Sequence, residues 1–209
     1  MVVLRFLGRC CIEIQTLQDH FIIDPHYFEP PEQGIEHIFI THAHDDHFDI
    51  EKIKEIREKY IEDEKELTIY GPKGLGKQTE LEIEDIKQEE EIELNDTIIT
   101  PYSVECYKAE ECYAYLITIG DVNVLHTADS ALFSEKLKRL KPKVDYCFVA
   151  CFEDNFEDYL NFLKDVYPKV TFPYHFDPGE EENAKKLVDY LNENTIEASF
   201  LEIGAKFEF

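Results

Sequence analysis

Histidine and aspartate side chains crowd one short segment of the chain. Residues 41–49 read THAHDDHFD and directly follow a short apolar run that is typical of a β-strand. A strand that ends in a turn presents alternate side chains to one side, so His42 and His44 can face one metal ion. Asp46 and His47, just past the turn, can face a second ion. Imidazole and carboxylate groups bind zinc and neighbouring first-row metals, so the segment predicts a metal site.

A surface loop that is rich in His and Asp without binding anything is the simpler alternative, since these residues favour turns. However, four imidazole or carboxylate groups within six positions would repel or desolvate one another if they packed together without a cation. Metal coordination removes that conflict. The pattern HxHxDH at residues 42–47, preceded by Thr41, resembles the signature of the metallo-β-lactamase superfamily.

Later segments match the same family in the expected order. Residues 122–130, VNVLHTADS, are similar to a family strand that ends in Gly-Asp-Thr and whose Asp bridges two metals. Here Ala128 and Ser130 replace the Gly and the Thr, and Asp129 is kept. Residues 170–176 resemble the strand that delivers the last His ligand. The resemblance implies one ion on His42 and His44, a second on Asp46, His47 and His175, and Asp129 as the bridge.

One expected ligand is absent. In the family, a further His between the HxHxDH turn and the bridging Asp completes the first metal site. Residues 99–107 occupy that place without a His, and Cys106 falls where the ligand is expected, with Glu105 beside it. A thiolate is a strong zinc donor, whereas a carboxylate suits iron or manganese better. The alternative is that neither residue binds and the first site is incomplete. One or two zinc ions are therefore expected, with iron or manganese as alternatives.

Composition indicates a folded protein with one domain over residues 1–209. The chain has 209 residues, of which 44% are hydrophobic, and this length suffices to bury a core. The sequence has neither an apolar run long enough for a membrane span nor a cationic, cleavable leader. We therefore expect a cytoplasmic protein with no membrane association.

The net charge of −25 argues against nucleic acid as a partner, because a phosphate backbone is held chiefly by Lys and Arg. A small-molecule substrate is expected instead. The six cysteines lack CxxC spacing, and in a cytosolic chain their default state is the free thiol. Cys106 alone has a location that suggests a function.

Hydrophobic periodicity predicts strands and helices in a mixed order. Strands are expected near residues 2–7, 11–16, 20–24, 37–41 and 67–70, and residues 92–125 are dense in strands. Asp49 is expected to cap a helix that runs to Ile61. After Asp129, helices at 134–140, 156–166 and 181–191 alternate with strands at 144–150 and 170–174. Periodicity alone supports only mixed α and β structure. The resemblance implies an α+β fold, a four-layer αββα sandwich with metals at one edge.

The resulting functional hypothesis is a metal-dependent hydrolase that directs a metal-activated water, oriented by Asp46, at a small ester, lactone, amide or phosphodiester. The absent His and Cys106 leave a second hypothesis open: a metal-binding or redox-responsive protein of the same fold without hydrolytic turnover. An iron enzyme that handles oxygen or sulfur is a third, since some relatives use iron.

Overall fold

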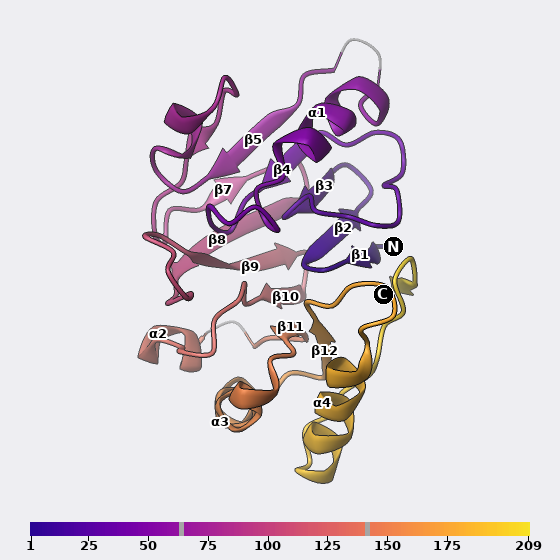
Figure 1. The fold of residues 1–209 in the computed structure, drawn as a ribbon, viewed down its shortest axis with the longest axis vertical. Helices are drawn as coiled ribbons and strands as arrows, with labels where there is room; N and C mark the ends of the chain where they lie inside the picture. Colours follow the sequence, from indigo (N-terminus) through magenta and orange to yellow (C-terminus); the bar gives the residue numbers. More distant parts are fainter. Residues whose placement is uncertain (63–64, 141–142) are drawn as a thin grey trace.

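Two β-sheets form the centre of the structure (Figure 1). The computed structural model describes residues 1–62, 65–140 and 143–209. Within these residues the first sheet has seven strands in the order β13-β1-β2-β3-β4-β5-β6. Their bounds are β1 Val3–Gly8, β2 Cys11–Gln15, β3 His20–Ile23, β4 His37–Phe39, β5 Thr68–Gly71, β6 Glu84–Asp85 and β13 Lys206–Glu208.

The second sheet has six strands within the described ranges, in the order β12-β11-β10-β9-β8-β7. They are β7 Ile92–Glu93, β8 Thr97–Ser103, β9 Tyr113–Ile119, β10 Val122–His126, β11 Tyr146–Ala150 and β12 Val170–Tyr174. The α-helices are α1 Ile50–Lys59, α2 Glu135–Lys138, α3 Phe156–Val166 and α4 Glu182–Glu193, with short 3-10 helices η1 Leu75–Gln78 and η2 Glu153–Asn155.

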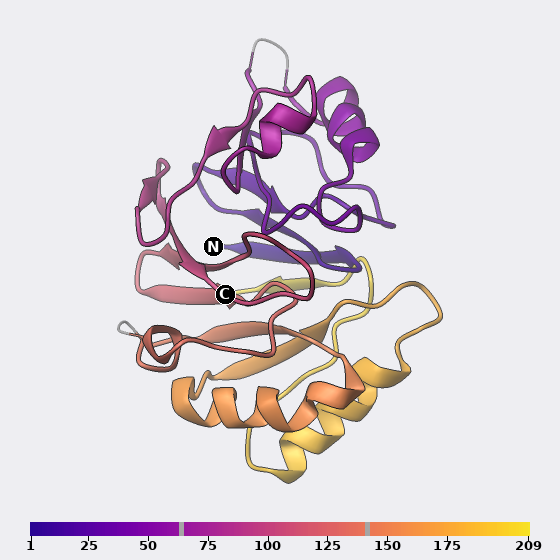
Figure 2. The same ribbon diagram turned by 60° about the vertical axis from the view of Figure 1, so that its left-hand side comes forward.

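The layers follow from the alternation of side chains along each strand. In β3, Phe21 and Ile23 point into the core between the sheets, whereas Ile22 belongs to a second apolar cluster together with Ile53 and Ile56 of α1. Helix α1 therefore covers the outer face of the first sheet, and α3 and α4 cover the outer face of the second (Figure 2). This arrangement confirms the predicted αββα sandwich.

Helix α1 starts where its sequence predicts. The Asp49 carboxylate accepts a hydrogen bond of 3.0 Å from the backbone N–H of Lys52, which satisfies one of the free donors of the first turn. None of the helices in the described ranges has the length and apolarity that a membrane crossing requires.

Parallel strands determine where the polar loops gather. Strands β3, β4 and β5 run parallel in the first sheet, as do β10, β11 and β12 in the second. Because parallel strands end at the same edge of a sheet, the segments that follow β3, β4, β10 and β12 can meet. That edge contains the predicted ligands.

Candidate metal centre

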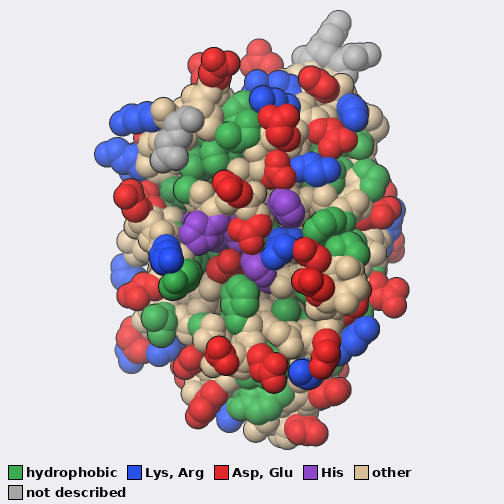
Figure 3. All heavy atoms as spheres, viewed as in Figure 1, with side chains coloured by type: hydrophobic (Ala, Val, Ile, Leu, Met, Phe, Trp, Pro, Cys, Tyr) green, Lys and Arg blue, Asp and Glu red, His purple; other side chains and the backbone are tan. Residues whose placement is uncertain are grey.

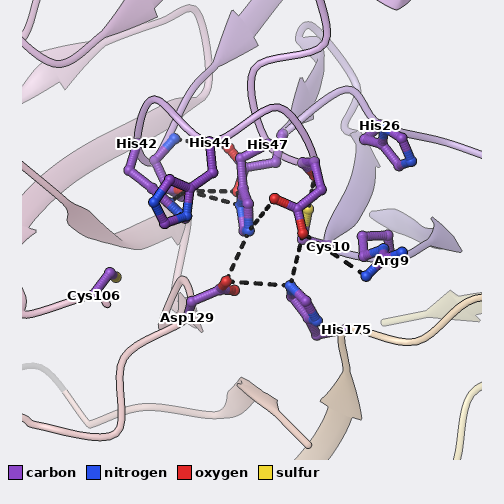
Figure 4. Close-up of polar contacts among 12 residues, drawn as sticks. Arg9, Cys10, His26, His42, His44, His47, Cys106, Asp129 and His175 are labelled. Atoms are coloured by element: carbon purple, nitrogen blue, oxygen red, sulfur yellow. Dashed lines mark hydrogen bonds and ion pairs between the residues drawn. The ribbon is translucent and has the colours of Figure 1, made fainter. Parts of the chain in front are cut away.

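The predicted ligands converge from three distant parts of the chain. Four lie in the loop after β4, one lies just beyond β10, and one directly follows β12. Figure 4 shows that the labelled ligands among them lie around a common centre. They are His42, His44, Asp46, His47, Asp129 and His175.

One half of this centre, formed by Asp46, His47, Asp129 and His175, has the separations of a shared ion; we call it the inner half. The Nε2 atom of His175 lies 3.2 Å from Asp129 Oδ2 and 3.4 Å from Asp46 Oδ2. The Nε2 atom of His47 lies 3.1 Å from Asp129 Oδ2. Donor atoms around one tetrahedral zinc ion lie about 3.4 Å apart, given the usual zinc–ligand distances. The inner half therefore has room for a metal ion.

Several inner-half atoms are buried without a hydrogen-bond partner within the described structure. They are Nε2 of His47, Nε2 of His175 and Oδ1 of Asp129. Buried polar atoms are rarely left unpaired, because each costs the free energy of its lost hydration. A bound cation would satisfy all three atoms, so the donor set fits a metal ion.

Asp24 orients His47 through the ring nitrogen that faces away from the centre. Its carboxylate, fully buried after β3, accepts hydrogen bonds from the backbone N–H of Thr41 at 2.8 Å and from Thr41 Oγ1 at 2.7 Å. Asp24 Oδ2 lies 2.7 Å from Nδ1 of His47. Nδ1 donates to this carboxylate and Nε2 of His47 points toward the centre; in the neutral ring Nε2 carries the lone pair, the arrangement that orients metal-binding imidazoles. Sequence reasoning used Asp24 only as a strand end and missed this role.

The backbone around the centre adopts a left-handed conformation at three residues other than glycine. The φ angles are 48° at Asp24, 51° at Ala128 and 72° at His175. Such a conformation costs about 1–2 kcal/mol per residue with a Cβ atom, and it persists where the surroundings enforce it. Tyr174 donates a 2.5 Å hydrogen bond from its hydroxyl to the Ala128 carbonyl. The φ angle also explains why the family has Gly at the position of Ala128.

The charges of the inner half stabilise one another. The polar contact with Nε2 of His175 at 3.4 Å lowers the pKa of Asp46 far below its usual range. Burial alone would raise the pKa of Asp129, but His47 and His175 lower it well below the ordinary value. Both carboxylates are therefore anionic near neutral pH and available to a cation.

His42 and His44 form the other half of the centre, which we call the outer half. Nε2 of His42 lies 3.0 Å from Nδ1 of His44, and Nδ1 of His42 lies 2.9 Å from Thr41 Oγ1. Burial, together with the charge of His47, lowers the pKa of His42 to about 4. His42 is thus a neutral imidazole at physiological pH, the form that ligates metals.

Cys106 is joined to Cys112 by a disulfide. The expectation of free thiols is therefore wrong for these two residues, because the turn between β8 and β9 brings them together. The backbone N–H of Val104 donates a 2.9 Å hydrogen bond to the Cys112 carbonyl. Ser103 of β8 pairs with Tyr113 of β9, so both cysteines lie in the turn that joins these two strands. The other four cysteines, Cys10, Cys11, Cys147 and Cys151, are free and buried.

A cavity of about 690 Å³ opens onto the centre. His44, Asp46, Asp129 and His175 form part of its lining, and Glu105 is exposed beside Cys106 at the same cavity. The histidine side chains reach the surface among Asp and Glu side chains near the middle of one face (Figure 3). The ligands are therefore accessible to a small molecule from solvent.

A family model described as the β-lactamase superfamily domain matches residues 14–193. The chain belongs to this superfamily. A comparison with curated proteins finds no match. Metallo-β-lactamase folds bind metals, and the described residues contain a candidate His/Asp site.

Solved structures of superfamily proteins share the fold at low identity. The metallo-β-lactamase fold protein YhfI from Bacillus subtilis is 17% identical, with a TM-score of 0.80 and full coverage (100%) of both chains. Igni18, a metallo hydrolase from the archaeon Ignicoccus hospitalis, is 16% identical, with a TM-score of 0.77 over 100% of this chain and 99% of Igni18.

CmlA, a diiron β-hydroxylase from Streptomyces venezuelae, shows that the fold is not limited to hydrolases. It is 15% identical, with a TM-score of 0.78 over 100% of this chain, which spans 54% of CmlA. The superfamily and fold are therefore established, while the metal and the reaction need a separate argument.

Proposed function

We propose that this chain is a metal-dependent hydrolase, with zinc at the centre and iron or manganese as the alternative metals. The observation that carries the proposal is the set of buried, unpaired donor atoms on His47, Asp129 and His175, beside a cavity that a small molecule can enter. A donor set of imidazoles and carboxylates suits zinc and also tolerates iron or manganese.

The residues of the centre divide the chemistry among them. Bound metal ions would supply a Lewis acid and an activated water. Asp129 contacts His47 and His175, and one of its oxygens also lies within 4.8 Å of donor atoms of His42 and His47, so its carboxylate would help to hold metal in both halves. Asp46 is 33% exposed at its side chain, so its anionic carboxylate can both ligate and accept a hydrogen bond from the attacking water. Asp46 is therefore the proposed orienting base of the reaction.

The cavity lining indicates the substrate class. Its described residues include the acids Glu105 and Asp154 beside the apolar side chains Tyr107, Leu132 and Phe152, and no Lys or Arg. An acidic rim repels anions, attracts cations and does not oppose the entry of neutral molecules. This lining favours a small ester, lactone or amide over a phosphodiester, and the net charge of −25 disfavours nucleic acid.

The test combines metal analysis with a variant that preserves shape. The chain is loaded with zinc and assayed against neutral, cationic and anionic esters, lactones, amides and phosphodiesters. We expect turnover of neutral or cationic substrates, and a loss of at least about a hundredfold in kcat for Asp46→Asn. Asp45→Asn is the matched control, because Asp45 is the exposed neighbour of Asp46 with the same charge.

Equal loss in both variants would point to general charge effects and contradict the role of Asp46. A zinc-loaded chain that turns over none of the panel would contradict hydrolysis and favour a metal-binding protein without turnover. If the freshly purified protein contains iron and the zinc-loaded chain is inactive, iron replaces zinc as the proposed metal.

A further inference from the structure

The Cys106–Cys112 disulfide lies against the outer half of the metal centre. One potential donor atom each of His42, Cys106 and Cys112 lies within 4.8 Å of the other two. Cys106 also lines the cavity that contains His44 and Asp129. In Figure 4 Cys106 lies on the same side of the centre as His42 and His44, away from His175. The two sulfur atoms therefore lie where the outer half lacks a donor.

The remaining donor atoms of the outer half are already oriented. Nδ1 of His42 is engaged by Thr41 Oγ1 at 2.9 Å, so Nε2 is the atom that faces Nδ1 of His44 at 3.0 Å. His42, Cys106 and Cys112 lie close together, and His44, through its contact with His42, would be the fourth donor of a Cys₂His₂ set, which binds zinc tetrahedrally. As a disulfide, neither sulfur is a thiolate, and the outer half loses both of these donors.

We propose that Cys106 and Cys112 are redox-controlled ligands of the outer metal ion. As thiolates they complete its coordination together with His42 and His44. As a disulfide they withhold two of the four donors. This inference rests on the metal centre proposed above, but not on its hydrolytic activity.

The segment that carries the cysteines can accommodate both states. Thiolates on one zinc ion lie about 3.8 Å apart, so the two sulfur atoms must separate on reduction. Cys112 is buried in the core, whereas Cys106 is half-buried and is followed by the exposed Tyr107 and Lys108, so Cys106 is the residue that can move with little loss of packing. The base of the segment stays closed by the hydrogen bond from Val104 N to the Cys112 carbonyl.

The chemical step balances with a dithiol as reductant. A thiolate of the dithiol attacks the half-buried Cys106 sulfur from the cavity, the Cys106–Cys112 bond breaks, and Cys112 leaves as a thiolate. The second thiol of the reductant then releases Cys106, so two electrons pass to the protein and the dithiol becomes a disulfide. Zinc binding displaces the protons of the two thiols. In reverse, hydrogen peroxide takes two electrons from the thiols, restores the disulfide and yields two waters.

The test measures metal binding to the full chain in both redox states. Protein reduced with a dithiol and protein oxidised with peroxide, each checked by counting free thiols, are titrated with zinc against a chromophoric chelator and separately loaded with cobalt. We expect one metal ion more per chain in the reduced state, and a thiolate-to-cobalt charge-transfer band in that state alone. Cys106→Ser and Cys112→Ser should abolish the band and the redox dependence. Cys147→Ala, a buried core position, is the matched control and should retain both.

Equal stoichiometry and affinity in the two states would overturn the redox-controlled ligands while leaving the inner half intact. A charge-transfer band that persists in both serine variants would assign the thiolate to another cysteine and overturn the proposal. If neither the reduced nor the oxidised protein binds metal, the metal centre itself is contradicted, and the proposed function with it.

Discussion

The inner and outer halves of the metal centre are built from different kinds of structure. In the inner half, the side chains of His47, His175 and Asp129 are only 0%, 7% and 14% exposed. Asp24 fixes His47 from the core, and the backbone N–H of His175 donates a 2.6 Å hydrogen bond to the Arg9 carbonyl. These positions are therefore set by the packing of the two sheets.

The outer half lies partly at the surface, although His42 itself is buried. His44 is half-buried, and the sulfur of Cys106 belongs to an exposed turn between β8 and β9. Such a turn can change its sequence and covalent state without disturbing the core. The comparison indicates that the inner half supplies a constant metal site, whereas the outer half can adopt new donors. The absence of the usual His is consistent with this division.

The largest effect is expected from Asp129→Ala, because Asp129 is the proposed bridge between the halves. Both ions should be lost or greatly weakened, with a fall of at least about a hundredfold in turnover. His42→Ala should lower the metal content only in the outer half. Elemental analysis of both variants, with the exposed Asp121→Asn as control, tests this order. Unchanged metal content in both variants would contradict the proposed metal centre.

Asp24→Asn comes next, because it keeps the shape of the side chain that orients His47 but removes its charge. Loss of such a supporting carboxylate lowers metal affinity by about 10–100-fold. The affinity of the inner ion, measured by chelator competition, should fall by this factor, while the dithiol-dependent binding at the outer half persists. Equal weakening of both ions would mean that the halves are not independent.

The sequence predicted the elements whose apolar pattern is strong. Helix α3 and strand β12 have the predicted bounds, since the buried face of α3 recurs at helical spacing through Tyr159, Leu163 and Val166. The ligand motif was equally readable, because four donor groups lie within six adjacent positions. Local information suffices where the signal is a period or a dense motif.

Contacts between distant parts of the chain could not be predicted from the sequence in the same way. The role of Asp24 depends on the parallel pairing of β3 with β4, which brings Thr41 and His47 to its carboxylate. The Cys106–Cys112 pair depends on the register of β8 against β9. Hydrophobic periodicity predicts that strands exist, but it does not determine which strands pair or in which register.

Thr41→Val should have a smaller effect than Asp24→Asn. The variant removes the hydroxyl that donates to Asp24 at 2.7 Å but keeps the backbone N–H that donates to the same carboxylate at 2.8 Å. A lost hydrogen bond to a charged, buried group lowers the free energy of unfolding by about 1.5–3 kcal/mol. Chemical denaturation should show this loss, and the affinity of the inner ion should fall less than in Asp24→Asn. A larger fall would make Thr41, not Asp24, the main support of His47.

Arg9→Gln should have the smallest effect, although Arg9 lies next to the inner half. Its guanidinium pairs with Asp177 at 2.6 Å and lies 3.8 Å from Asp46 Oδ2, but the Arg9 side chain is 26% exposed. Exposed ion pairs contribute at most about 1 kcal/mol. His175 is held through the backbone carbonyl of Arg9, which the substitution leaves in place. We therefore expect unchanged metal stoichiometry and a small loss of stability in thermal unfolding. Loss of the inner ion in this variant would show that an ion pair near the surface positions the inner half. The inner half would then not be set by the packing of the two sheets.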